Sequence, residues 1–322
     1  MSILIAILLV VIGFILLIKG ADFLVDSSSN IAKRFHIPEI IIGLTIVSIG
    51  TSLPELYISL SSVLDQHTDI ALGNIIGSSI CNLLLILGIS ATIRPLKVKR
   101  ETRLIEIPMC LIFTIIFGMF CNTMAEISRV EAIALLGLFI MFILYTIVMA
   151  FKGEKFDSKD GDIEEENTEN KSPKSMLQIV IYIILGIVGL KFGGDLVVNN
   201  ALIIAEYFNL SEQIISLTIV AIGTSLPELV TSVVASIRGD SDISIGNILG
   251  SNIFNMTLIT GISSLINPIP YNLAYNGQFI ILIFATIMLL LFPLIPPKNK
   301  LSRRNGIIYL ILYVIFSILL LK

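Results

Sequence analysis

Residues 43–62 read GLTIVSIGTSLPELYISLSS, and residues 216–235 read SLTIVAIGTSLPELVTSVVA. At an offset of 173 residues, 13 of these 20 positions are identical. The same offset aligns LGNIIGSSICNLLLILG at 72–88 with IGNILGSNIFNMTLITG at 245–261, where ten of 17 positions match. Repetition at a fixed offset is typical of a fold built from copies of one unit. The chain is therefore predicted to contain two copies of a unit that is about half its length.

The composition is that of a helical membrane protein. Hydrophobic residues make up 55% of the 322 positions and charged residues only 14%, whereas a soluble domain carries about 25% charged residues. Many apolar runs approach the roughly 20 residues that cross a bilayer as a helix. Runs such as Ile3–Ile18 do not alternate polar and apolar residues, as the strands of a transmembrane barrel would. We therefore expect an all-α polytopic membrane protein.

Hydropathy predicts ten membrane-spanning helices. They cover residues 2–21, 37–62, 70–92, 104–122, 130–151, 176–199, 211–237, 242–267, 276–297 and 305–321. The second, third, seventh and eighth spans are the least uniformly apolar, because they carry Ser, Thr, Asn, Gly and Glu inside the apolar stretch. These four spans contain the repeated segments, so the duplicated parts of the chain are its polar ones.

The distribution of basic residues predicts the orientation of the spans. With the N-terminus outside, the inner side holds 18 of the 21 Lys and Arg residues, which is the asymmetry that cytoplasmic loops show. Lys19 follows the first apolar run and no basic residue precedes it, the reverse of a secretory signal. We therefore predict a protein of the plasma membrane with both termini outside. Residues 152–175 are polar and acidic, and are expected to form a cytoplasmic linker.

The repeat and the span count together predict an inverted topology. The first unit covers residues 1–151 and the second covers 176–322, with five spans in each. Because each unit has an odd number of spans, the second unit must enter the membrane from the opposite side. Inverted repeats in transporters place the substrate site near the bilayer midplane, at the interface of the two halves.

The GTSLPE motif of both units places a carboxylate directly after a proline, at Glu55 and at Glu228. Pro54 and Pro227 lack an N–H group and clash with the carbonyl four residues earlier, so spans two and seven are expected to be broken helices. An ionisable group at the bilayer centre costs at least about 2.5–3.5 kcal/mol and indicates a functional role. The facing segments offer neither carboxylate a Lys or Arg partner. Together the two negative charges match one divalent cation.

Oxygen-bearing side chains recur at helical spacing around both carboxylates. They are Ser48, Ser52 and Ser59 with Glu55; Ser225 and Ser232 with Ala221 and Glu228; and the stripes Asn74, Ser78, Asn82 and Asn247, Ser251, Asn255. Such oxygens suit Ca²⁺, Mg²⁺ and Na⁺, and the sequence has no His or Cys cluster to suit Zn²⁺ or Cu²⁺. An isolated Ser or Thr in a membrane helix often only bonds within or between helices. The prediction therefore rests on the symmetric recurrence of these residues.

At these residues the sequence resembles the cation/Ca²⁺ exchanger superfamily, in particular prokaryotic Na⁺/Ca²⁺ exchangers. The resemblance covers essentially the whole chain and rests on the two GTSLPE segments and the GNxxGS segments that follow them. It implies an antiporter that moves Ca²⁺ against Na⁺ through overlapping sites by alternating access. Its expected partners are these two ions and the lipid bilayer, with no cofactor beyond the transported ions. The ligands it implies are Glu55, Glu228, Thr51, Ser52, Thr224, Ser225, Ser78, Asn82, Ser251 and Asn255, with backbone contributions near Ser48 and Ala221.

The two units differ at positions beside these ligands. Ser79 and Cys81 stand where the second unit has Asn252 and Phe254, and we expect both differences to be packing variants. Asn255 stands where some relatives have Asp. The resemblance implies that a carboxylate there goes with K⁺ dependence, so Asn255 argues against K⁺ co-transport.

Other functions are less well matched. A Ca²⁺/H⁺ antiporter on the same fold is the nearest alternative, but the many hydroxyl and amide oxygens favour Na⁺ because protons need no such cage. A cation channel is a further alternative, although two dissimilar halves that meet at one deep charged site indicate a carrier. No enzyme is expected, because His36 and His67 lie in predicted loops. No basic patch with interleaved aromatic residues predicts a nucleic-acid partner, and no obligate protein partner is evident.

Overall fold

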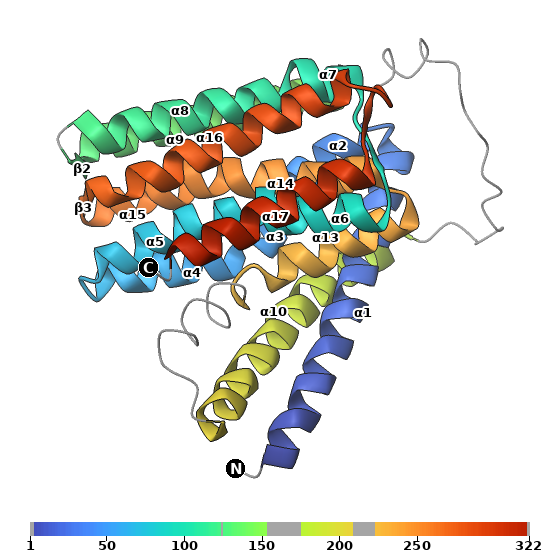
Figure 1. Ribbon diagram of the computed structural model, residues 1–322. Helices are drawn as coiled ribbons and strands as arrows, with labels where there is room; N and C mark the ends of the chain where they lie inside the picture. Colours follow the sequence, from blue (N-terminus) through green and yellow to red (C-terminus); the bar gives the residue numbers. More distant parts are fainter. Residues whose placement is uncertain (1–2, 124, 153–174, 209–222, 321–322) are drawn as a thin grey trace.

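The computed structural model describes residues 3–123, 125–152, 175–208 and 223–320 of the chain. Within these residues the chain forms a bundle of helices (Figure 1). Two antiparallel strand pairs join the halves of the chain: β1 (Leu96–Lys97) with β4 (Lys300–Leu301), and β2 (Glu126–Ile127) with β3 (Ile269–Pro270). Apart from its first and last residues, the predicted linker 152–175 lies outside the described part.

The helices of the two halves occupy corresponding positions in the sequence. The first half contains α1 (Ile3–Phe35), α2 (Glu39–Ile42), η1 (Gly43–Val47), α3 (Ser48–Thr51), α4 (Leu53–Leu64), α5 (Thr68–Ile80), η2 (Cys81–Ile86), α6 (Leu87–Ile93), α7 (Arg100–Leu104), α8 (Glu106–Thr123) and α9 (Arg129–Lys152). The second half contains α10 (Met176–Tyr207), α13 (Leu226–Arg238), α14 (Ser241–Phe254), η5 (Asn255–Ile259), α15 (Thr260–Ile266), η6 (Leu273–Tyr275), α16 (Asn276–Leu291), η7 (Phe292–Leu294) and α17 (Arg303–Leu320). At the offset of 173, the starts of α4 and α13 coincide, and so do both ends of α6 and α15.

Eight helical stretches among the described residues are long and apolar enough to cross a membrane. They are Ile3–Phe35, Thr68–Ile93, Arg100–Thr123, Arg129–Lys152, Met176–Ala205, Ser241–Ile266, Asn276–Leu294 and Arg303–Leu320. A ninth is the pair Glu39–Thr51 and Leu53–Leu64, which is bent by 48°. The predicted span 211–237 is described only from Gly223 onward, so its first part lies outside the described residues. The helical, polytopic character predicted from the sequence is confirmed; the described residues contain eight or nine such spans, and the count of ten remains a prediction.

The first and sixth predicted spans are longer as helices than hydropathy indicates. The apolar run 2–21 belongs to a helix that continues to Phe35, and the run 176–199 belongs to one that continues to Tyr207. Hydropathy ends the first span at the polar stretch that contains Ser27 and Ser28, but both serines are fully buried. The helix therefore extends through polar residues that hydropathy excludes from the span.

The helices α1 and α10 pack against each other through glycines and stand at an angle to the remaining bundle (Figure 1). A Cβ atom at Gly20 would meet the carbonyl oxygen of Gly186 at 2.8 Å, and one at Gly193 would meet that of Gly13 at 2.8 Å. Only glycine allows two helix backbones to approach this closely. The pair is consequently a close-packed unit of its own.

The polar repeated helices form the centre of the bundle. In the stretches Thr68–Ile93 and Ser241–Ile266, 72% and 83% of an apolar 18-residue segment is buried inside the protein. The corresponding share is 22% in α1 and in α10. Every residue of α14 is buried. Because the hydroxyls and amides of these helices would be costly to expose to lipid, this arrangement places the polar stripes inside the protein.

Candidate functional site

Each GTSLPE motif contains a break at its serine, followed by a new helix. Ser52 has φ −87° and ψ 8°, and Ser225 has φ −90° and ψ 10°, so neither is helical. The next helix begins one residue later in each half, with Pro54 or Pro227 in its first turn. Proline is tolerated there because the first N–H groups of a helix have no partner within it. Each break thus presents the glutamate that follows in the first turn of a helix.

Glu55 and Glu228 meet at the centre of the bundle. Each residue is only 1% exposed, and their carboxyl groups lie close enough to interact electrostatically. Ser52 donates a hydrogen bond to Oε1 of Glu228 at 2.8 Å, which joins the first motif to the second. Within the described part of the chain no Lys or Arg forms an ion pair with either glutamate.

The predicted oxygen ligands gather around this pair. Oε2 of both glutamates has no hydrogen-bond partner, and the same is true of buried polar atoms in four neighbours. These atoms are Oγ of Ser78, Oγ of Ser225, Oδ1 of Asn82, and both Oδ1 and Nδ2 of Asn255. A buried polar atom without a partner is costly, and buried polar atoms are nearly always bonded. Unpartnered oxygens also occur elsewhere, for example at Ser90 and Glu106, but those at Ser78, Ser225, Asn82 and Asn255 belong to residues that the sequence predicts as ligands.

The structure places the remaining predicted ligands in different ways. Ser251 lies 2.9 Å from Oγ of Ser52. Thr51 donates to Oδ1 of Asn247 at 3.0 Å. Thr224 lines the cavity described below. Ala221 lies outside the described residues.

Ser48 is engaged within its own helix. Its hydroxyl donates to the carbonyl of Leu44 at 2.7 Å. Its own carbonyl accepts from the amide of Ser52 at 3.0 Å, and the hydroxyl of Thr51 lies 3.3 Å from it. The single Thr51 proton can be donated either to this carbonyl or to Asn247, so the predicted backbone contribution near Ser48 depends on which of the two Thr51 bonds.

Two asparagines support the glutamates in equivalent ways. Asn247 donates to Oγ of Ser232 at 2.9 Å and to the carbonyl of Glu228 at 3.4 Å. Asn74 donates to Oγ of Ser59 at 3.2 Å and to the carbonyl of Glu55 at 3.5 Å. The sequence places these asparagines on the polar stripes but does not reveal that they fix the glutamate backbones; their identical place in both repeats was the available signal.

Asn252 corrects one expectation. Its Oδ1 accepts a hydrogen bond from Asn82 at 3.0 Å, and its Nδ2 donates to the carbonyl of Ser79 at 3.2 Å. It is therefore not a mere packing variant, because it orients a predicted ligand from the other half. Its counterpart Ser79 donates only to its own helix, at Ile75, so the equivalent amide of Asn255 is left without a partner.

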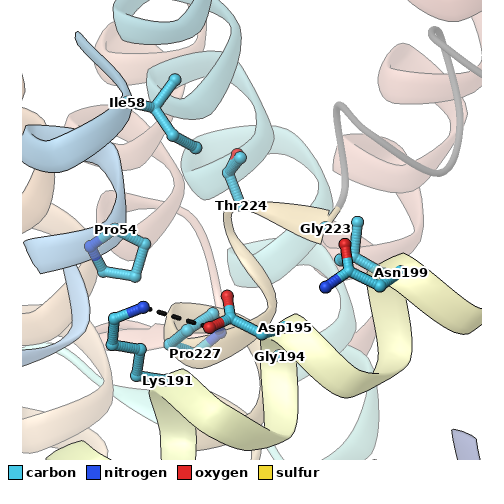
Figure 2. Close-up of a pocket in the computed structure, with 10 residues that line it drawn as sticks. Pro54, Ile58, Lys191, Gly194, Asp195, Asn199, Gly223, Thr224 and Pro227 are labelled. Atoms are coloured by element: carbon cyan, nitrogen blue, oxygen red, sulfur yellow. Dashed lines mark hydrogen bonds and ion pairs between the residues drawn. The ribbon is translucent and has the colours of Figure 1, made fainter. Parts of the chain in front are cut away.

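A cavity of about 210 Å³ opens beside the two breaks (Figure 2). Pro54 and Pro227 line it, together with Thr224 and residues of α10 that include Lys191 and Asp195. No group of three or more His, Cys, Asp or Glu side chains suited to a metal ion occurs among the residues described. The donors at the centre are carboxylate, hydroxyl and amide oxygens, which suit hard cations such as Ca²⁺ and Na⁺.

Comparison with known proteins places these features in a family. The sodium/calcium exchanger protein family matches residues 5–148 and 178–322. The sodium/calcium exchanger MaX1 of Methanosarcina acetivorans is 30% identical over 97% of this chain and 97% of its own length. The inner membrane protein YrbG of Escherichia coli is 35% identical over 88% of this chain and 87% of its own. Among solved structures, the sodium-calcium exchanger NCX_Mj, soaked with zero Na⁺ and Ca²⁺, superposes with a TM-score of 0.83 at 31% identity, covering 100% of both chains.

Proposed function

The chain belongs to the sodium/calcium exchanger family, and from this premise we propose that it exchanges Ca²⁺ for Na⁺ across the plasma membrane. The observation that carries the proposal is the buried pair Glu55 and Glu228, which has no basic partner among the described residues and is surrounded by unpartnered oxygens. Ca²⁺ takes six to eight oxygen ligands, including carboxylates, carbonyls and amides. Two carboxylates and one Ca²⁺ balance in charge.

The proposed ligands come from both halves of the chain. Each glutamate supplies at least its free Oε2, and Ser78, Ser225, Asn82 and Asn255 supply oxygens that have no other partner. Thr51, Ser52, Thr224 and Ser251 complete the set, with backbone oxygens near Ser48 and Ala221. Overlapping use of these oxygens by Ca²⁺ and Na⁺ makes the two ions compete, which is the condition for antiport. No cofactor beyond the transported ions takes part.

The proposed architecture is ten membrane-spanning helices arranged as two inverted repeats, 1–151 and 176–322, with the helices of spans two and seven broken at Ser52 and Ser225. The coincidence of α4 with α13 and of α6 with α15 at one offset supports it. Residues 152–175 form a cytoplasmic linker, and both termini lie outside. In such repeats alternating access arises when one bundle rocks or slides against the other around the fixed site. We assign the moving part to the close-packed pair α1 and α10.

Transport is proposed to be electrogenic. Inward Na⁺ movement drives Ca²⁺ out, and the membrane potential contributes about 2.3 kcal/mol for each net charge moved across 100 mV.

The test is ⁴⁵Ca²⁺ uptake into proteoliposomes loaded with Na⁺ and diluted into Na⁺-free buffer. Uptake is expected to require the outward Na⁺ gradient, to ignore an imposed pH gradient and to disappear when external Na⁺ equals internal Na⁺. Uptake that follows the pH gradient and ignores Na⁺ would identify a Ca²⁺/H⁺ antiporter on the same fold. Ca²⁺ flux without any counter-ion would indicate a channel.

A further inference from the structure

The cavity beside the two breaks contains a charge pair that the exchange reaction does not require. Lys191 and Asp195 lie one turn apart on α10, with Nζ and Oδ2 separated by 3.0 Å. Both side chains line the cavity (Figure 2), and they are 50% and 51% exposed. The cavity also reaches Thr224, a proposed ligand, and the prolines of both motifs. An ion that enters the site through this cavity passes both charges.

The corresponding positions of the first half differ in burial. At the offset of 173, Thr224 corresponds to Thr51, Val198 to Val25 and Gly194 to Ala21. Thr51, Val25 and Ala21 are fully buried, whereas Thr224, Val198 and Gly194 line the cavity. The described residues thus place a cavity beside Thr224, with Lys191 and Asp195 on its wall.

The charges of the two regions differ as well. Asp195 corresponds to Asp22, which pairs with Arg238 of α13 instead of facing an open cavity. Lys191 corresponds to Ile18, so the lysine belongs to the second half alone. The positive charge of Lys191 beside a cation path opposes the entry of cations. The negative charge of Asp195, which pairs with Lys191, offsets this effect.

Fixed charge at an entrance acts differently on ions of different valence. A local potential changes the local concentration of an ion by a Boltzmann factor whose exponent is proportional to the ionic charge. The factor for a divalent ion is therefore the square of the factor for a monovalent ion. A single charge at this entrance shifts the balance between Ca²⁺ and Na⁺ without touching either ion.

We propose that Lys191 and Asp195 form an entrance charge pair that sets the ratio of the apparent affinities for Ca²⁺ and Na⁺ on the face where the cavity opens. The proposal rests on the Na⁺/Ca²⁺ exchange proposed above. A purely structural role is the competing explanation, because oppositely charged residues four apart on a helix also stabilise that helix. The two roles differ in what they change. A structural role alters thermal stability. An entrance role alters the half-saturation concentrations, and the factor for Ca²⁺ is the square of the factor for Na⁺.

The test uses the full chain in proteoliposomes of known orientation, with half-saturation concentrations for Ca²⁺ and Na⁺ measured separately on each face. On the cavity face, Lys191→Gln is expected to lower the value for Ca²⁺ by about 4-fold and that for Na⁺ by about 2-fold. Asp195→Asn is expected to raise the value for Ca²⁺ by about 4-fold and that for Na⁺ by about 2-fold, and the double variant is expected to return close to wild type. Added choline chloride should shrink every effect, because the Debye length falls to about 3 Å at 1 M salt.

Lys19→Gln is the matched control, since Lys19 is an exposed lysine of the partner helix α1 that does not line the cavity. It should leave both values unchanged. Equal fold-changes for the two ions, or no change with Lys191→Gln in a protein that still exchanges, would overturn the entrance role. Failure of the wild-type protein to exchange at all would instead refute the function on which the proposal rests. Lys191→Gln decides alone if Asp195→Asn fails to fold.

Discussion

At the scale of single residues, the proposed site centres on two buried carboxylates that form no ion pair with a Lys or Arg of the described residues. Glu55 and Glu228 each stand in the first turn of a helix that starts after a non-helical serine. The exposed N–H groups and the dipole of a helix N-terminus favour negative charge there. This stabilisation is partial, since one oxygen of each carboxyl group lacks a partner. If the proposed site is correct, removing either charge should remove the reason for a divalent ion to bind.

Glu228→Gln and Glu55→Gln are each expected to reduce Na⁺-dependent Ca²⁺ uptake by roughly 100-fold or more, which corresponds to about 3 kcal/mol of lost ion stabilisation. The shape of the side chain is kept, so the variants should remain folded by size-exclusion chromatography. Glu106→Gln is the matched control, because Glu106 is also 1% exposed and also has one unpartnered oxygen, but lies on α8 outside the repeated motifs. Normal uptake with Glu228→Gln, or equal loss with Glu106→Gln, would contradict the assignment.

Asn255 offers the converse experiment, in which charge is added. Both of its amide atoms are buried without a partner, so an aspartate fits the same space. Asn255→Asp is expected to lower the half-saturation concentration for Ca²⁺ by about 10-fold, since one additional unit charge near the ion contributes on the order of 1.4 kcal/mol. The measurement is concentration-dependent ⁴⁵Ca²⁺ uptake, with Asn267→Asp at the end of α15 as the control. An unchanged or higher value would place Asn255 outside the ion site.

The acidic pair and the polar stripes of this site could be predicted from the sequence, because spacing and repetition mark them. The supporting hydrogen bonds could not. That Asn82 meets Asn252 depends on how two helices from different halves cross, and no local pattern encodes that contact. The state of Ser48 was also hidden, since whether its carbonyl is free depends on the rotamer of Thr51.

At the scale of helices, α1 and α10 differ from the other spans because their backbones pack closely against each other. Hydropathy alone does not reveal this difference. The glycines along their contact bring the backbones together. Hydropathy located both helices but ended each of them early, because it registers apolar residues and not the protein surface that covers polar ones. The bend of 48° at Ser52 lies where the proline suggested a break.

Gly20→Ala is expected to destabilise the protein by about 1–3 kcal/mol, because overpacking forces the backbones apart. The added Cβ would meet two backbone atoms at 2.8 Å, the carbonyl oxygen of Gly186 and the amide nitrogen of Leu190. Gly137→Ala on α9 is the matched control, since nothing lies within 4 Å of its Cβ position. That variant should be as stable as wild type or gain up to about 1 kcal/mol from helix propensity.

Thermal unfolding of the detergent-solubilised protein distinguishes these glycine variants. A lower Tm for Gly20→Ala alone supports the close contact of α1 and α10. Equal Tm values for the two variants would show that the contact is loose.

At the scale of the whole molecule, the family and the helical membrane character expected from the sequence are confirmed. The spans within the described residues number eight, or nine with the bent pair, and the inverted arrangement remains a prediction. It has a direct consequence for the two ends of the bundle: the turn near Lys298 should face the cytoplasm, and the turn near Asn272 should face outside.

Labelling of one introduced cysteine at a time checks this orientation. The native Cys81, Cys110 and Cys121 are buried, so background labelling should be low. In intact cells a membrane-impermeant thiol reagent is expected to label Asn272→Cys, and to label Lys298→Cys only after permeabilisation. The opposite pattern would show that the predicted orientation is reversed. Labelling of both positions from one side would contradict the single span, 276–297, predicted between these two turns.

The central claim is that Ca²⁺ and Na⁺ compete for one site built on Glu55 and Glu228. Isothermal titration of the purified protein with Ca²⁺, repeated at increasing Na⁺ with choline to hold ionic strength constant, tests it most directly. The account predicts that the Kd for Ca²⁺ rises steadily with Na⁺ concentration in the wild type, and that Ca²⁺ binding is lost in Glu228→Gln at every Na⁺ concentration. A Kd that does not change with Na⁺, or Ca²⁺ binding that survives in Glu228→Gln, would contradict it.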